Sequence, residues 1–226
     1  MSVTLPLGFS AAGVACGLKN SGKRDFAVVV NNGPHHVAAA VTTSNRVYAA
    51  PVEWTRQAVA DHQLSAVALN SGGANACTGE AGYTDTVATA HLVAAQLGVK
   101  PADVAICSTG LIGELLDMDA IRRGVSQACS QLSEDGGQNA ALAIMTTDTK
   151  PKTAHYRGKY SIGGMAKGAG MLAPQLATML VVITTDAMLS EVEADAALKV
   201  ATGQTLDRID SDGCMSTNDT VILMAS

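Results

Sequence analysis

Residues 163–186 read Gly163-Gly-Met-Ala-Lys-Gly-Ala-Gly-Met-Leu-Ala-Pro-Gln-Leu-Ala-Thr-Met-Leu-Val-Val-Ile-Thr-Thr-Asp186, and this segment organises the rest of the chain. Glycines lead to Pro174, and Thr178 then opens an apolar run that is typical of a buried strand. The hydroxyl of such a threonine neighbours the carbonyl of Ala177 and can attack it. An N-to-O acyl shift followed by hydrolysis would leave Thr178 as a new amino terminus.

A terminal threonine carries the base that its own hydroxyl needs. An α-amine has a pKa of about 7.7–8.0, against about 10.4 for a lysine side chain, so a useful share of it is neutral at physiological pH. The free amine of Thr178 could therefore activate its own Oγ, as in other threonine nucleophiles at chain termini. We predict cleavage between Ala177 and Thr178 and covalent catalysis by Thr178. The alternative is an ordinary strand threonine.

The strings around this threonine resemble a known family. Lys167-Gly-Ala-Gly-Met, Ala-Thr-Met-Leu at 177–180 and Thr-Thr-Asp-Ala at 184–187 are similar to the self-cleavage segment of the ornithine acetyltransferase (glutamate N-acetyltransferase) family of cyclic arginine biosynthesis. The resemblance extends from Gly8 to Thr220. It implies a layered α/β fold of the self-processing ornithine acetyltransferase and β-aminopeptidase type. Residues 1–177 would form an α chain after cleavage, and residues 178–226 would begin the β chain.

A second family-like string follows an apolar strand at 104–107. It reads Ser108-Thr-Gly-Leu-Ile-Gly113, and we expect it to form a turn. Small residues at such a turn can aim backbone N–H groups at a developing oxyanion. Taken alone, the string is more often a strand-end turn that needs glycine. The resemblance implies that Thr109 and Gly110 form the oxyanion hole.

Two further strings concern the substrate. Thr146-Thr-Asp-Thr149 resembles the family's substrate-side segment, which implies that Thr146 contacts the substrate together with Lys167 and Thr178. Its alternative is ordinary turn chemistry. Lys167 stands among glycines, so we expect it to pack against nothing and to aim its ammonium at a substrate carboxylate or at solvent. The string Asp212 to Thr220 also resembles the family, without a chemical role that the residues themselves suggest.

The resemblance implies an activity as well. Acetyl would move from N2-acetyl-L-ornithine to L-glutamate through an acetyl-threonine ester, with acetyl-CoA as an alternative donor and no other cofactor. It implies two α and two β chains from one precursor. The five scattered cysteines favour reduced thiols, and therefore a cytoplasmic protein. Two alternatives stay open: a related self-processing aminopeptidase, and an inactive fragment that needs a partner chain.

Composition limits the protein class. The 226 residues are 47% hydrophobic, 15% charged and 3% aromatic, with a net charge of −5. This favours a well-buried globular protein over disorder, and it argues against nucleic-acid binding. Apolar stretches are too short to span a membrane. Five scattered cysteines and five histidines show no ligand spacing, so we expect no metal site.

Hydrophobic patterning predicts alternating strands and helices, and therefore a layered α/β protein. Family chains continue further, so we expect the apolar run Val221-Ile-Leu-Met224 to lack a packing partner. Strands are predicted at 26–30, 37–43, 66–69, 104–107, 144–147 and 179–185, with a hairpin across 154–162. Helices are predicted at 51–62, 80–97, from 117 or 119 to 132, and 190–201.

Overall fold

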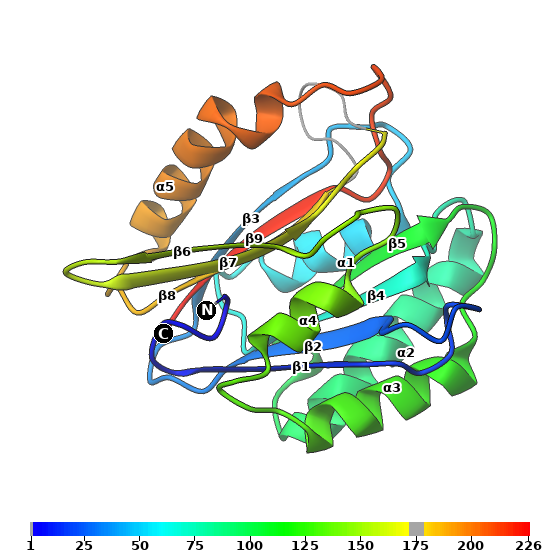
Figure 1. Ribbon diagram of the computed structural model, residues 1–226, viewed down its shortest axis with the longest axis horizontal. Helices are drawn as coiled ribbons and strands as arrows, with labels where there is room; N and C mark the ends of the chain where they lie inside the picture. The colour runs from blue at the N-terminus through cyan, green and yellow to red at the C-terminus, as the bar shows by residue number, and fades with distance from the viewer. Residues whose placement is uncertain (1, 172–178) are drawn as a thin grey trace.

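A computed structural model describes residues 2–171 and 179–226, and it contains two β-sheets that lie face to face (Figure 1). The first sheet has the order β1 (Phe9–Val14), β2 (Phe26–Asn31), β4 (Ala66–Gly73) and β5 (Val104–Leu111). The second has the order β3 (Val37–Thr42), β9 (Thr220–Ala225), β8 (Leu180–Thr185), β7 (Ser161–Lys167) and β6 (Lys152–Arg157). The β4–β5 and β8–β9 pairs are parallel, and the other pairs are antiparallel.

Helices cover the outer faces of the two sheets, so the fold has four layers. The outer face of the first sheet is covered by α2 (Gly79–Leu97) and α3 (Met118–Ser130), and that of the second by α5 (Glu191–Gln204) (Figure 1). The short helix α4 (Gly137–Ala143) packs on β1 and β2 and reaches β7, while α1 (Ala50–Ala58) packs on β5. Two 3-10 turns span Pro101–Asp103 and Leu206–Arg208. The predicted layered α/β class is confirmed.

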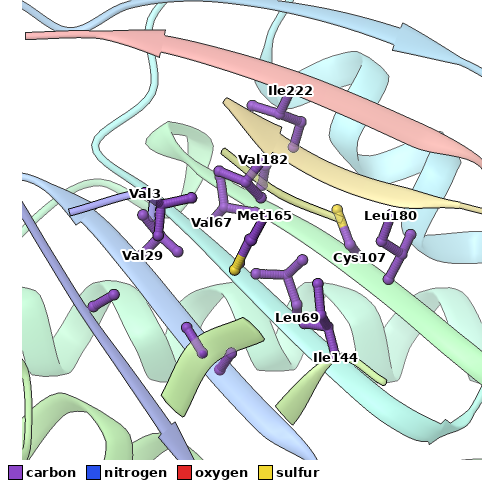
Figure 2. Packing of buried hydrophobic residues seen from close by; sticks show 14 of the residues in the cluster. Val3, Val29, Val67, Leu69, Cys107, Ile144, Met165, Leu180, Val182 and Ile222 are labelled. Atoms are coloured by element: carbon purple, nitrogen blue, oxygen red, sulfur yellow. The ribbon is translucent and has the colours of Figure 1, made fainter. Parts of the chain in front are cut away.

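Strand alternation divides the core into layers. In β4, Val67 and Leu69 lie between the sheets, whereas Ala66 and Ala68 pack beneath the helices of the first sheet. The same alternation in β5 assigns Cys107 to the inter-sheet layer. Figure 2 shows this layer, with residues of both sheets and of α4 interleaved. Because aromatic residues are few, the layer consists largely of aliphatic side chains, methionine and cysteine.

Several helix ends follow the predicted signals. Asp117 caps α3 by accepting from the backbone N–H groups of Asp119 and Ala120. Ser190 and Glu193 form the predicted capping box of α5. The hairpin of β6 and β7 is also where the alternation predicted it.

The strand predicted at 144–147 is wrong. The preceding residues form α4, and Ile144 is its buried C-cap. The chain entering this helix approaches β1 so closely that a Cβ on Gly136 would lie 1.7 Å from the carbonyl oxygen of Ala11. Ile144 packs between the sheets as the residue that ends this helix, and not as part of a strand. Helix α1 is also shorter than predicted, because the chain turns after Ala58 and His62 adopts a positive φ of 58°.

The expectation for the last apolar run is also wrong. Residues 221–224 belong to β9, which pairs with β3 on one side and β8 on the other. Their side chains are at most 7% exposed. They pack alternately against the inter-sheet layer and against α5. This run therefore has packing partners on every side within the described residues.

Candidate functional site

A cavity of about 620 Å3 opens where the carboxyl ends of β4 and β5 meet the end of β7. Its volume lies within the range of small-molecule sites. A second groove of about 590 Å3, between α5 and the outer face of β7 and β8, contains none of the predicted site residues. The first cavity is lined by Lys19, Gly72, Thr109, Gly110, Leu111, Thr146, Thr147, Lys167, Gly170, Met171 and Asp212.

Four of the predicted site residues thus share one cavity: Thr109, Gly110, Thr146 and Lys167. The predicted cleavage pair, Ala177 and Thr178, lies outside the described residues.

Thr109 and Gly110 lie within β5, which continues to Leu111, so the turn predicted to begin at Ser108 is wrong. Gly110 pairs with Gly72 of β4, next to an irregularity in the register. The φ of Gly110 is +136°, and a Cβ there would lie 2.4 Å from the carbonyl carbon of Gly72. Only glycine fits this position without displacing β4.

Lys167 is the last residue of β7 and pairs with Leu180 of β8. Its side chain is only 3% exposed, so both the unpacked lysine and the solvated lysine that the sequence suggested are excluded. Strand alternation explains its direction, because Met165 two residues earlier lies in the inter-sheet layer. Thr109, two residues after Cys107, faces the same layer from the opposite sheet. The two side chains meet there, with Lys167 Nζ 3.0 Å from Thr109 Oγ1.

The ammonium group of Lys167 is buried, which is unusual for a lysine. Burial lowers the pKa of its ammonium to about 8, although the charges of Asp148 and Asp219 oppose this shift. A protonated lysine only donates hydrogen bonds. Thr109 Oγ1 therefore accepts from Lys167, and its own hydroxyl proton stays available for another acceptor.

Asp148 anchors the loop whose residues Thr146 and Thr147 line one side of the cavity. Its Oδ1 accepts from the side chain of Lys152 and from the backbone N–H of Gly168 at 3.0 Å, and its Oδ2 accepts from the backbone N–H of Thr146 at 3.2 Å. Burial opposes ionisation, yet these hydrogen bonds keep the pKa of Asp148 below its ordinary value. Asp148 was not predicted as a site residue, although it stands inside the family-like string at 146–149.

Asn218 and Asp219 were also missed. Both are buried in the loop that precedes β9. Asn218 Nδ2 donates to the carbonyl oxygen of Ser108, and Asp219 Oδ1 accepts from the backbone N–H of Met179. Burial raises the pKa of Asp219 to about 7. Its Oδ2 has no hydrogen-bond partner among the described residues.

Three further observations concern a metal site, the buried thiol of Cys107 and membrane-spanning helices in the described ranges 2–171 and 179–226. No group of three or more His, Cys, Asp or Glu side chains there could hold a metal ion. Burial raises the pKa of Cys107 to about 12, so this thiol is not a nucleophile at neutral pH. None of the helices described is both long enough and apolar enough to cross a bilayer.

Comparison with known proteins shows the family of this chain. The model of the ArgJ family matches residues 10–226. The chain belongs to the ArgJ family. The arginine biosynthesis bifunctional protein ArgJ of Thermobifida fusca is 62% identical over the whole chain, and that of Bifidobacterium longum is 60% identical. The chain spans 59% of the length of each of these relatives.

Solved structures agree with the family assignment. The ornithine acetyltransferase of Mycobacterium tuberculosis, crystallised with ornithine, is 51% identical with a TM-score of 0.75, and the match covers 79% of this chain and 96% of that chain. ArgJ of Bacillus halodurans is 34% identical with a TM-score of 0.67, covering 80% and 95%. An aminopeptidase of Ochrobactrum anthropi, a variant of the Ntn hydrolase fold, has a TM-score of 0.56 at 12% identity, which shows a common fold alone. The resemblance seen in the sequence is confirmed.

Proposed function

We propose that this chain belongs to an acyltransferase that moves acetyl from N2-acetyl-L-ornithine to L-glutamate in cytoplasmic arginine biosynthesis. The observation that carries the proposal is the buried hydrogen bond from Lys167 Nζ to Thr109 Oγ1, beside Gly110, in a cavity of substrate size. Family membership supports the same reaction, since ArgJ relatives are named for arginine biosynthesis.

The nucleophile of this proposal is Thr178, exposed as a terminus by self-cleavage. Its Oγ attacks the carbonyl of Ala177, the peptide C–N bond breaks, and water then hydrolyses the ester. Ala177 keeps the new carboxylate, and Thr178 keeps the free amine. Coverage of the solved relatives supports this division: the chains from M. tuberculosis and B. halodurans are almost wholly matched by about four fifths of this chain, the share that residues 1–177 represent.

Acetyl transfer then takes two balanced steps. Thr178 Oγ attacks the acetyl carbonyl of N-acetylornithine while the terminal amine takes the hydroxyl proton. The C–N bond breaks, and ornithine leaves with that proton on its amine. The amine of glutamate next attacks the threonine ester, gives up a proton, and releases the Thr178 hydroxyl. The threonine ester carries the acetyl group, so no metal or organic cofactor is required, and acetyl-CoA serves as an alternative donor.

Thr109 and Gly110 act on the charge that develops in both steps. The hydroxyl of Thr109 and the backbone N–H of Gly110 donate to the tetrahedral oxyanion. Lys167 Nζ donates to Thr109 Oγ1, so the hydroxyl proton of Thr109 is left to donate to the oxyanion. In a site where water is excluded, such preorganised donors stabilise the transition state strongly.

Substrate recognition in this proposal uses Lys167, Thr146 and Thr178. The ammonium of Lys167 attracts a carboxylate of the amino-acid substrate, and Thr146 contacts the acyl-amino group from the loop that Asp148 anchors. The active assembly is proposed to contain two α and two β chains. Nucleic acid and membrane are not among its partners.

An assay with and without glutamate tests this function. The full-length gene product should form N-acetylglutamate from N-acetylornithine and glutamate, and it should release little acetate when glutamate is omitted. Thr178→Ala should abolish both self-cleavage and transfer. Rapid acetate release without glutamate would instead indicate an amide hydrolase.

A further inference from the structure

A buried polar loop lies between the two strands that bear the proposed reaction centre. Residues 216–219 are at most 9% exposed. Their backbone is fixed from outside the loop, because Ala49 donates to the carbonyl oxygen of Thr217 at 2.9 Å and Thr43 donates to that of Asp219 at 2.9 Å. The backbone positions of the side chains in this loop are therefore fixed by hydrogen bonds.

Asn218 reaches from this loop to the oxyanion side. Its Nδ2 donates to the carbonyl oxygens of Ala74 at 2.7 Å and Ser108 at 2.9 Å. The carbonyl of Ser108 belongs to the same planar peptide unit as the backbone N–H of Thr109. The hydroxyl of Thr217 donates to Asn218 Oδ1 at 2.6 Å, which fixes the orientation of the amide.

Asp219 reaches in the other direction, to the start of β8. Its Oδ1 accepts from the backbone N–H of Met179 at 2.8 Å. The carbonyl oxygen of Met179 accepts from the backbone N–H of Thr220 at 3.1 Å. Both polar groups of the Met179 backbone are thus held by two consecutive residues. The chain connects Met179 directly to Thr178, so this contact restrains the first bond after the proposed nucleophile.

We propose that Asn218 and Asp219 form a clamp that sets the spacing between the oxyanion donors of β5 and the start of β8. Both are positioning residues, since they contact the backbones of Ser108 and Met179. The inference rests on the proposed function, because the spacing matters only if a nucleophile next to Met179 reacts beside Thr109. A displacement of about 1 Å in such a site costs on the order of 10²-fold in rate.

The test compares acceptor-retaining and acceptor-removing variants in the full-length gene product. Asp219→Asn keeps an oxygen that can accept from Met179, and Asp219→Ala does not. We expect Asp219→Ala to lower kcat per cleaved chain at least ~10-fold with KM within about threefold, and Asp219→Asn to recover kcat to within about threefold of the original. Hydrogen exchange of the Met179 amide should be fast in Asp219→Ala and slow in Asp219→Asn.

Asn31 offers a matched control for Asn218. It is buried, and its Nδ2 also donates to two carbonyl oxygens, those of His35 and Ala225, at the far end of β9. Asn218→Ala should lower kcat at least ~10-fold, whereas Asn31→Ala should lower the thermal midpoint without lowering kcat. Equal kcat losses in the two variants would assign Asn218 a merely structural role and overturn the clamp.

The outcomes also separate the clamp from the proposed function. An inactive original protein would overturn the acetyl transfer itself. An active protein in which Asp219→Ala keeps its kcat, or in which Asp219→Asn is as slow as Asp219→Ala, would overturn positioning by the acceptor oxygen while leaving the acetyl transfer intact.

Discussion

The buried hydrogen bond between Lys167 and Thr109 allows a direct test of the Thr109 hydroxyl as an oxyanion donor. Thr109→Val removes the hydroxyl and leaves the Lys167 ammonium without this acceptor. If the hydroxyl donates to the oxyanion, kcat should fall about 10²–10³-fold, the usual cost of one such donor. Steady-state kinetics of acetyl transfer would measure this. A nearly unchanged kcat would place the donation in the backbone N–H groups alone.

Asp219 should make stability depend on pH. Its pKa rises from 3.8 to about 7 because burial disfavours the carboxylate. The folded state therefore binds the proton more tightly than the unfolded chain, and the folded protein loses stability as pH rises from about 4 to about 7. The Asp219→Asn side chain does not titrate, so this variant lacks the pH-dependent contribution to stability. Urea unfolding would measure the free energy of unfolding at pH 4.5 and at pH 8. Between these two pH values, the original protein should lose about 1 kcal/mol or more beyond the loss in Asp219→Asn. Parallel losses in both proteins would contradict the shift.

Residues of the site could be predicted where a short string carries the signal. Thr109, Gly110, Thr146 and Lys167 stand in such strings, and the structure brings all four to one cavity. Asn218 and Asp219 could not be assigned because their partners are far away in the chain. Asn218 bonds a residue 110 positions earlier, and Asp219 bonds one 40 positions earlier.

At the scale of elements, Gly110 tests how closely β4 and β5 must approach. Gly110→Ala would force its Cβ into the backbone of Gly72, so the free energy of unfolding should fall by about 1–3 kcal/mol. Gly113 is the control, because its φ is also positive, at +88°, and a Cβ added there would meet nothing within 4 Å among the described residues. Urea titration should show a greater loss for Gly110→Ala. Equal losses would mean that the positive φ alone requires glycine.

Elements with strong local signals were predicted, and those set by packing were not. The capping box of α5 and the hairpin of β6 and β7 are local features. The strand predicted at 144–147 fails because Ile144, the residue that ends α4, is buried by packing between the sheets and not by strand pairing. The length of β5 was missed for a similar reason, because β4 extends the ladder past Ser108.

At the scale of the whole molecule, the two sheets enclose a shared core, and β9 lies inside the second sheet. Burial of β9 means that its apolar run does not drive association of this chain. We still expect residues 1–226 alone to transfer acetyl poorly, because two amino-acid substrates must be oriented and the ArgJ relatives are longer. Supplying, in cis or in trans, the additional length that the ArgJ relatives have should restore transfer. Full activity of a monodisperse preparation of the 226 residues would contradict this expectation.

The terminal threonine is the central claim, and intact-mass spectrometry with amino-terminal sequencing tests it most directly. An active preparation of the full-length gene product should contain a species that begins Thr-Met-Leu-Val, from Thr178 onward. After incubation with N-acetylornithine without glutamate, that species should gain one acetyl group, and glutamate should remove it. An active preparation that stays a single uncleaved chain would contradict the account.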